Sequence, residues 1–379
     1  MKTCVVLVGG QGTRLRPFTL NYPKPMLWVY DQPHLFNLLQ QLSNAGFEHV
    51  ILSLGYLHEA ITTTVGDGSQ FGLTVTYVLD SMTNPGTAGA LRECLRATDA
   101  KTLLVLNGDI VTDLNLGDVW NYHLTHNAPI TLATTPVTDP TRFGVVVSNK
   151  YNNVTQFLEK PDNPPTNEIN AGVYVMDSYV FDDLPLGHSM LETDLFPCYA
   201  LKRQIKVYHH EGYWLDIGKP AQYYQVFWDH LNHKVTMPST VTKPALVAQA
   251  DGWYGDIGAE FTLTNVMRVG LALAHNLKGR SLLIGYGQGC WSQEFAQLLY
   301  DTLSHRGVLT IPIKPSQTLA DFQEVIRYNC CSDGLFVGAA GGDEAQQALR
   351  LFEPNGNSWA SGKLQALITQ ANLITDLTT

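Results

Sequence analysis

The sequence predicts an α/β protein: a mostly parallel, mixed sheet covered by helices, followed by a smaller α/β domain. Three observations predict this class. Short apolar runs alternate with amphipathic stretches of about ten residues along the first half of the chain. A stretch rich in Pro, Thr and Gly then interrupts the alternation, which resumes beyond it. At 379 residues, the chain is also too long for one ordinary hydrophobic core.

The first half contains five apolar runs that we expect to form strands. An amphipathic stretch at 35–46, closed by Gly46, is expected to form a helix. Strands interleaved with helices favour a Rossmann-like sheet with helices on both faces. Ligands of such sheets lie beyond the carboxyl ends of the strands, so the polar residues that end each run are the candidates for chemistry. The expected strands are 4–9, 49–55, 73–78, 102–109 and 130–137.

The second half repeats this alternation after an interruption. We place a linker at 236–250, between a first domain at 1–235 and a second at 251–379. In the second domain, helices and strands are expected to alternate, because amphipathic stretches are followed by short apolar runs. The expected helices are 262–277, 292–307 and 319–329, and the expected strands are 280–287, 308–313 and 334–340.

Composition and charge exclude several classes of protein. A formal net charge of -10 argues against a general nucleic-acid surface, which requires clustered basic residues. No run of 18 apolar residues is present, so we expect no membrane span and a cytoplasmic location. The six cysteines, with Cys330 and Cys331 adjacent, lack the spacing of a zinc site or a disulfide scaffold and are expected to be free thiols.

A glycine-rich loop follows the first expected strand. Residues 9–12 read GGQG, and three cations, Arg14, Arg16 and Lys24, come just after them. Such a loop can present backbone N–H groups to an anion, although many similar loops are only tight turns. Lys24 does not follow the loop as in G-K-[ST], which excludes a Walker A loop, and the spacing does not fit G-x-G-x-x-G.

The loop belongs to a longer series of motifs. GGQGTRLRPFT at 9–19 is followed by PKPM, PGTAGAL, LNGD, FGVVV, EKP, NAGVYV and WLDIG, in this order, over about residues 1–235. Together these motifs resemble the signature of the nucleotide-sugar pyrophosphorylases, the sugar-1-phosphate nucleotidyltransferases. The resemblance implies an enzyme that joins a nucleoside triphosphate to a hexose-1-phosphate and releases pyrophosphate. Positioning of two anions and neutralisation of the charge between them would supply the catalysis.

The resemblance also implies roles for individual residues. Arg14 would face the leaving pyrophosphate, Lys24 the α-phosphate, and Lys160 the sugar phosphate. Asp109 and Asp216 would share a Mg²⁺ ion, since hard oxygen ligands suit that cation. The substrate-binding residues would be Gly9, Gly10, Gly12 and Thr13 at the triphosphate, Gly86 and Thr87 at the base, and Gly144, Glu159, Asn170 and Gly172 at the sugar.

Other polar residues receive no firm role. Arg16 either contacts phosphate or only closes the loop. Asp113 is a candidate cap for the segment that ends the LNGD region, and it is not assigned to the site. His209 and His210 are adjacent in an expected strand, so their side chains point to opposite faces and a shared metal is not expected.

The second domain resembles, more weakly, the first domain of the phosphohexomutases. DGWYGDIGAEFT follows the opening motif of that family with Tyr254 in place of an arginine. In the segment that aligns with the active-site loop, Ala340 occupies the serine position and Gly341 the histidine position. Alanine cannot carry a phosphoryl group, so mutase activity is not expected. We expect a scaffold for dimerisation, for covering the active site or for regulation, and a homo-oligomeric protein.

Base and sugar specificity remain open between two alternatives. The motifs are most similar to mannose-1-phosphate guanylyltransferases, which use GTP. The combination with a serine-less mutase domain is more similar to the cyanobacterial UDP-glucose pyrophosphorylases, and on that ground we favour UTP and glucose-1-phosphate. A catalytically silent regulatory subunit is a third alternative, but such a subunit would be expected to lose the signature cations and aspartates that this chain keeps.

Overall fold

The computed structural model falls into two compact units. The structure describes residues 1–30, 32–80, 86–182, 184, 187–236, 245–287, 289, 291–314, 318–329, 332–340, 343–375 and 377. Unit 1 comprises Met1–Arg14, Pro23–Met26 and Pro33–Pro238, and unit 2 comprises Leu15–Tyr22, Leu27–Gln32 and Ser239–Thr379. Positions 237–244 of the predicted linker, with Gly341, Cys330 and Cys331, lie outside the described residues. The domain boundaries at 235 and 251 stay a proposal.

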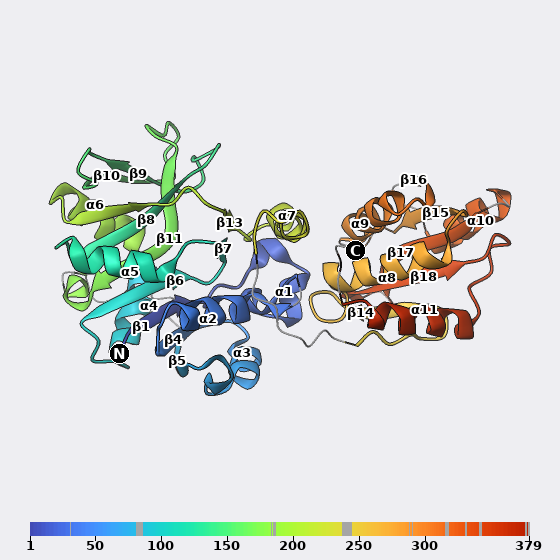
Figure 1. The fold of residues 1–379 in the computed structure, drawn as a ribbon, viewed down its shortest axis with the longest axis horizontal. Helices are drawn as coiled ribbons and strands as arrows, with labels where there is room; N and C mark the ends of the chain where they lie inside the picture. The colour runs from blue at the N-terminus through green and yellow to red at the C-terminus, as the bar shows by residue number, and fades with distance from the viewer. Residues whose placement is uncertain are drawn as a thin grey trace. The chain divides into compact units, whose positions relative to one another are not determined.

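Unit 1 is built on one large mixed sheet (Figure 1). Its centre is parallel, because β1 pairs with β4 and β6, and β4 pairs with β5, all in the same direction. Antiparallel pairing of β11 with β6 extends the sheet on the other side. The described strands of this sheet are β1 (Thr3–Leu7), β4 (His49–Leu54), β5 (Thr74–Leu79), β6 (Thr102–Asn107), β8 (Ile130–Pro136), β9 (Gly144–Ser148), β10 (Val154–Glu159), β11 (Glu168–Asp177) and β12 (Ile205–His209).

Helices cover both faces of this sheet, as the sequence predicts. Cys4 and Val6 of β1 belong to one apolar core, and Val5 belongs to the other, which is the alternation expected of a strand. Leu35 and Leu39 of α2 lie in the first core, and Leu91 of α4 lies in the second. The helices of unit 1 are α2 (His34–Asn44), α3 (His58–Val65), α4 (Gly86–Leu95), α5 (Leu116–Thr125), α6 (Phe196–Leu201) and α7 (Pro220–Leu231).

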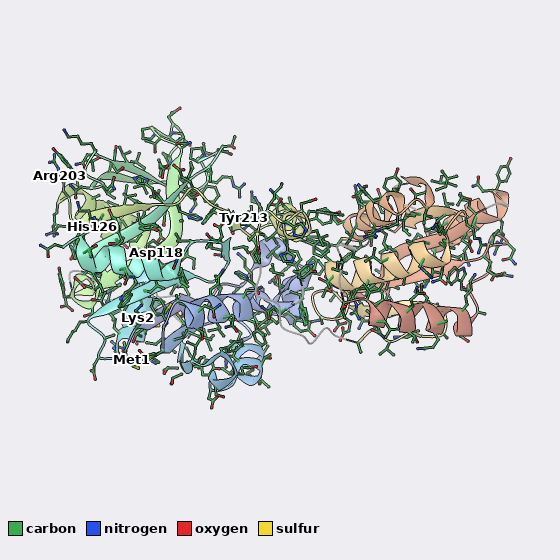
Figure 2. All side chains as sticks on the ribbon, in the orientation of Figure 1. Met1, Lys2, Asp118, His126, Arg203 and Tyr213 are labelled. Atoms are coloured by element: carbon green, nitrogen blue, oxygen red, sulfur yellow. The ribbon has the colours of Figure 1, made fainter. Side chains whose placement is uncertain are left out.

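A short two-stranded ribbon lies outside the main sheet of unit 1. It pairs β7 (Ile110–Thr112) with β13 (Trp214–Asp216) in antiparallel register. Tyr213, labelled in Figure 2, donates a hydrogen bond from its hydroxyl to Asp229 of α7 at 3.1 Å. Its carbonyl oxygen accepts from the N–H of Asp113 at 3.2 Å. Both contacts therefore fix the same end of the ribbon, at Tyr213 and Asp113, while its other end, at Ile110, follows closely after β6.

Unit 2 contains a five-stranded sheet in the order β14-β18-β17-β15-β16. Its strands are β14 (Trp253–Asp256), β15 (Ser281–Tyr286), β16 (Leu309–Lys314), β17 (Asp333–Ala340) and β18 (Asp343–Phe352). Its helices are α8 (Leu263–Asn276), α9 (Ser292–His305), α10 (Leu319–Asn329) and α11 (Ser361–Leu373), with the short α1 (Phe18–Asn21) and the two-residue strand β2 (Trp28–Val29) from earlier in the chain. Another two-residue strand, β3, spans Gln32–Pro33.

Buried polar contacts hold parts of unit 2 together. The guanidinium of Arg268 in α8 donates to the carbonyl oxygens of Ala371 and Asn372 at 3.1 and 3.2 Å. Asp333 at the start of β17 is buried and forms an ion pair with Arg280 at 2.8 Å. Ala340 ends β17 and is buried. Within the described residues, no helix is both long and apolar enough to cross a membrane.

Candidate active site

The carboxyl edge of the parallel strands gathers polar residues from distant parts of unit 1. Gly9 and Gly10 follow β1, Asp80 follows β5, and Asp109 follows β6, while Ser53 lies near the end of β4. Because these four strands run in the same direction, their ends meet at one edge of the sheet. The topology therefore brings the loop and Asp109, which the sequence singles out, to the same edge as Ser53 and Asp80.

The glycine-rich loop is closely packed at its first residue, Gly9. A Cβ on Gly9 would lie 2.2 Å from Oδ2 of Asp80, and a Cβ on Gly55 would lie 2.4 Å from the carbonyl oxygen of Gly9. Gly12 has a φ of 62°, in the region that favours glycine. Gly9 and Gly55 thus need glycine for close approach, and Gly12 for its backbone conformation, while Gly9 and Gly10 line the cavity beyond β1.

Lys24 lies between two carboxylates. Its ammonium is 2.5 Å from Oδ2 of Asp109 and 3.9 Å from Oδ1 of Asp216. Burial alone would raise the pKa of Asp109, but the charge and hydrogen bond of Lys24 hold it below its usual range. Burial and the charge of Asp109 raise the pKa of Asp216. The cluster therefore combines a firmly ionised carboxylate with one whose charge is unfavourable in the absence of another cation.

The two-stranded ribbon sets the spacing of the two aspartates. Asp216 pairs with Ile110, and the N–H of Ile217 donates to the carbonyl oxygen of Asp109 at 3.0 Å. The N–H of Gly218 donates to Oδ1 of Asp216 at 2.7 Å, and a Cβ on Gly218 would also lie 3.2 Å from Nη2 of Arg14. The ribbon thus places Arg14, Lys24 and both carboxylates in one cluster.

A buried histidine lies close to Asp109 and Lys24 of this cluster. His34, at the start of α2, has 1% of its surface exposed. Burial lowers the pKa of its imidazole to about 4, although the charge of Asp109 acts in the opposite direction. His34 is therefore neutral at physiological pH. No motif pointed to this residue, because its significance depends on burial beside Asp109.

The first of two cavities at this edge has a volume of about 650 Å³. It begins at the glycine-rich loop and Lys24 and extends to the start of α4. There, the hydroxyl of Thr87 donates to Oε2 of Glu192 and accepts from the N–H of Leu191, both at 2.9 Å. The cavity is lined by Leu7, Val8, Gly9, Gly10, Lys24, Pro25, Ser53, Asp80, Gly86, Thr87, Ala90, Asn107, Gly108, Asp109, His188 and Met190.

The second cavity has a volume of about 480 Å³ and shares Asn107 and Asp109 with the first. Lys160, just after β10, forms an ion pair with Glu159 in its wall. Gly172 has a φ of 73° and lies against Asn107, while its N–H donates to Oδ1 of Asn170 at 2.9 Å. The lining residues are Arg14, Asn107, Asp109, Ile110, Thr141, Arg142, Phe143, Gly144, Glu159, Lys160, Asn170, Gly172, Glu192, Trp214, Asp216 and Lys219.

The structure brings together most of the residues that the sequence predicts for the site. All of them line one of these two cavities except Gly12 and Thr13, which lie in the loop without lining either. His209 and His210 pair separately, with Glu168 at 3.4 Å and Asp113 at 3.0 Å.

Several lining residues were missed from the sequence. Lys219 directly follows the WLDIG motif, and Arg142 directly precedes FGVVV, so inspection of the flanking positions would have found both cations. Glu192 carries no such signal, because it reaches the cavity from a short π-helix, Leu191–Leu195, that contains none of the motifs. Asp80 likewise lies in no motif. It can be recognised as a lining residue only when β5 is placed beside β4.

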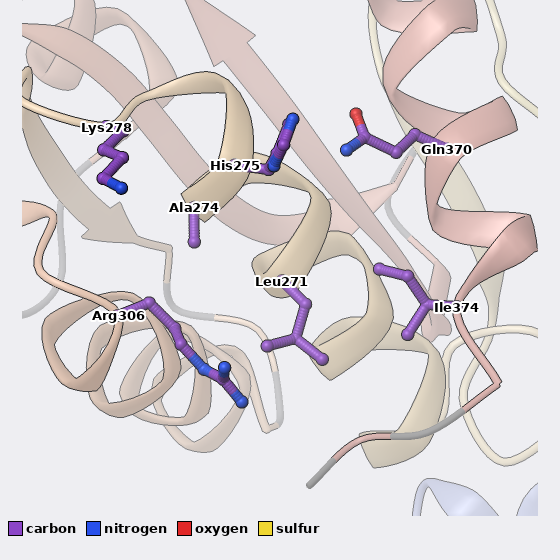
Figure 3. A pocket seen from close by; sticks show the side chains of 7 residues that line it. All are labelled: Leu271, Ala274, His275, Lys278, Arg306, Gln370 and Ile374. Atoms are coloured by element: carbon purple, nitrogen blue, oxygen red, sulfur yellow. The ribbon is translucent and has the colours of Figure 1, made fainter. Parts of the chain in front are cut away.

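Unit 2 has a separate cavity of about 430 Å³, shown in Figure 3. It is lined by Leu271, Ala274, His275, Lys278, Arg306, Gln370 and Ile374. His275 and Lys278 lie at the end of α8, and Arg306 follows α9. Cations commonly occupy such positions because they offset the partial negative charge of a helix C-terminus. We therefore assign no function to this cavity.

Comparison with known proteins agrees with the geometry of unit 1. The mannose-1-phosphate guanylyltransferase of Mycobacterium tuberculosis is 39% identical over 223 residues, which are 58% of this chain and 62% of that protein. The mannose-1-phosphate guanyltransferase of Kluyveromyces lactis is 31% identical over 261 residues, covering 67% of this chain and 70% of that protein. The crystal structure of HddC from Yersinia pseudotuberculosis complexed with GMP-PN matches with a TM-score of 0.52 and 26% identity, over 60% of this chain and 99% of that one.

These similarities concern the first part of the chain. The chain spans 62% of the length of its M. tuberculosis relative. A family model described as nucleotidyl transferase matches residues 3–233, which include the glycine-rich loop, Lys24, Asp109, Lys160 and Asp216. The chain therefore belongs to the nucleotidyl transferase family.

Proposed function

We propose that this chain transfers a nucleotidyl group from GTP to mannose-1-phosphate, releasing pyrophosphate. The observation that carries the reaction class is the pair of adjoining cavities that share Asn107 and Asp109. One is bordered by a glycine-rich loop and Lys24, and the other by Arg14 and Lys160. Two anionic substrates could therefore occupy neighbouring cavities, with a cluster of cations and carboxylates where the cavities meet.

In this proposal the protein acts mainly by positioning and by charge. An oxygen of the sugar phosphate attacks the α-phosphorus of the triphosphate, the bond to the pyrophosphate breaks, and pyrophosphate leaves. Lys24 stabilises the negative charge that develops at the α-phosphate, and Arg14 binds the departing pyrophosphate. Lys160 holds the sugar phosphate, while Glu159, Asn170 and the backbone at Gly144 and Gly172 contact the sugar.

The residues present fit a divalent metal ion. Asp109 and Asp216 offer hard oxygen ligands, and the raised pKa of Asp216 reflects burial together with repulsion between the two carboxylates. Mg²⁺ commonly takes one or two carboxylates together with substrate phosphates, so these two side chains would hold it. When bound, the ion would supply positive charge between the two substrates.

The names of the relatives support one choice of substrates. Architecture alone favours UTP and glucose-1-phosphate, but both relatives described above are named for mannose-1-phosphate and a guanylyl group. The structural match with HddC contains GMP-PN, a guanine nucleotide. We therefore propose the GTP and mannose-1-phosphate alternative, and keep the homo-oligomeric state, the cytoplasmic location and the scaffold role of unit 2 as predictions.

A substrate grid tests the proposal. GTP, UTP, dTTP and ATP are each combined with mannose-1-phosphate, glucose-1-phosphate and N-acetylglucosamine-1-phosphate, with MgCl₂, and pyrophosphate release is measured. The highest kcat/KM is expected for GTP with mannose-1-phosphate. A maximum at UTP with glucose-1-phosphate would support the other specificity. Absence of pyrophosphate release from every pair would contradict an enzymatic role and favour the silent subunit.

A further inference from the structure

Asp80 is held rigidly in the wall of the first cavity. Its backbone N–H donates to the carbonyl oxygen of Leu54 at 2.6 Å, which ties it to the end of β4. The hydroxyl of Ser53 donates to Oδ1 at 2.7 Å, and Oδ2 lies against Gly9. Strand β4 and the glycine-rich loop therefore fix the direction of this carboxylate.

The carboxylate has acceptor capacity that the described residues do not use. Its two oxygens can accept about four hydrogen bonds. Among the residues that the structure describes, Ser53 is the one side chain that donates to it, and no basic side chain forms an ion pair with it. Burial raises the pKa of Asp80, which means that its charge is held at a cost. A ligand that brings hydrogen-bond donors would offset that cost.

The ligand group next to Asp80 must be a donor. A phosphate group would be repelled by the carboxylate, whereas Lys24, which lines the same cavity and forms no ion pair with Asp80, suits phosphates. In a nucleoside triphosphate, the donors away from the phosphates are on the ribose and the base. The edge of guanine offers two adjacent donors, N1–H and the N2 amino group, which match the two oxygens of a carboxylate.

We propose that Asp80 is a specificity-determining residue that accepts hydrogen bonds from N1–H and the N2 amino group of guanine. This inference rests on the proposed function, whose nucleotide it specifies. Uracil and thymine offer a single N3–H between two carbonyl oxygens, and those oxygens would be repelled by the carboxylate. A site built around buried hydrogen-bonding groups discriminates strongly against a ligand that lacks the matching donor.

The proposal is tested by removing one hydrogen-bonding partner at a time, first from the nucleotide and then from the protein. ITP lacks the N2 amino group of GTP but is otherwise the same nucleotide. Asp80→Asn removes the charge with little change in shape. For the unmodified protein, kcat/KM is expected to be about 10–100-fold higher with GTP than with ITP, the effect of one charge-assisted hydrogen bond. In Asp80→Asn this ratio is expected to fall to within about threefold of one.

Two controls exclude a structural explanation. Asp67→Asn changes a carboxylate on an exposed loop, where it accepts from the N–H of Ser69 at 3.0 Å, and is expected to leave the ratio unchanged. Thermal unfolding of each variant checks that the fold is kept. If Asp80→Asn lowers activity with GTP, ITP and UTP by the same factor and keeps the GTP-to-ITP ratio, Asp80 has only a structural role and the proposal is wrong.

Binding measurements separate this inference from the proposed function. Calorimetric titration with GTP and with ITP, in MgCl₂ without sugar phosphate, reports base recognition even if no pyrophosphate is released. Tighter binding of GTP that is lost in Asp80→Asn supports the inference even if the proposed reaction fails. Equal affinity of the unmodified protein for GTP and ITP, or binding of neither, overturns it.

Discussion

The ammonium of Lys24 lies 2.5 Å from Oδ2 of Asp109, and only 10% of the Lys24 side chain is exposed. This nearly buried cation is paired with a carboxylate that lines both cavities. It is therefore positioned to stabilise the negative charge that develops in the transition state. We predict that Lys24→Ala lowers kcat for pyrophosphate release by about a hundredfold to a thousandfold, because it removes a preorganised charge. Asp109→Ala is expected to have a comparable effect, measured in the same assay.

Lys234 provides the matched control for this prediction. It forms a similar ion pair, 2.8 Å from the buried Asp229, but lines neither cavity of unit 1. Lys234→Ala is expected to keep kcat within about twofold of the unmodified protein, because this largely exposed lysine lies outside both cavities. Equal losses of kcat in the two lysine variants would show that the effect of Lys24 is structural.

The ionised carboxylate of Asp216 is predicted to lower the stability of the fold, although it is needed for activity. Because its pKa is raised in the folded protein, its ionisation destabilises the fold as pH rises through that pKa. Asp216→Asn should therefore unfold at a higher temperature than the unmodified protein at pH 7.5 in EDTA, by about 2 °C or more. The same variant should lose at least about a hundredfold in kcat, since a metal ligand is removed. A lower unfolding temperature in EDTA would contradict the repulsion between Asp109 and Asp216.

Lys160 is predicted to act on the sugar phosphate. It lies in the wall of the second cavity, beside Glu159, and does not line the first. Lys160→Ala should raise KM for mannose-1-phosphate by about tenfold or more, while KM for GTP changes little, because one charge-assisted contact is lost. Lys150→Ala, at an exposed lysine over the ring of Tyr151, is the control. A larger change in KM for GTP than for the sugar phosphate would reverse the assignment of the two cavities.

Local pattern was sufficient to predict much of the fold. The stretch at 319–329 is a helix with those bounds, and 334–340 lies within β17, because each carries the periodicity of its element. Strand β18, at Asp343–Phe352, was not predicted. Its first half is polar, and it is ordered by antiparallel pairing with β14 and β17, which is a long-range contact that local sequence does not display.

The candidate site, like the fold, could be predicted only in part from local sequence. Asp109 and Asp216 stand in motifs and could be named from the sequence, whereas the contact of Lys24 with both depends on the ribbon of β7 and β13. Asp80 and His34 stand outside every motif. Their environments arise from strand order and burial, so only the folded structure identifies them.

His34 gives a prediction for the dependence of stability on pH. Its pKa is lowered to about 4 in the folded protein, against about 6.5 when unfolded. Protons then bind preferentially to the unfolded chain between these values, so the free energy of unfolding falls as pH drops from about 6.5 to 4 and is fully retained above 6.5. The contribution is about 3 kcal/mol, since each pKa unit corresponds to about 1.4 kcal/mol.

The measurement is urea-induced unfolding at several pH values between 4 and 7. His34→Gln should show a shallower loss of stability across this range, because the group that takes up a proton on unfolding is absent. His233→Gln, at an exposed position after α7, should keep the slope of the unmodified protein, since water surrounds this side chain before and after unfolding. If His34→Gln does not fold, the ring resonances of His34 in the unmodified protein can be followed by NMR. A midpoint near 6.5 there would show that burial beside Asp109 does not hold this imidazole neutral.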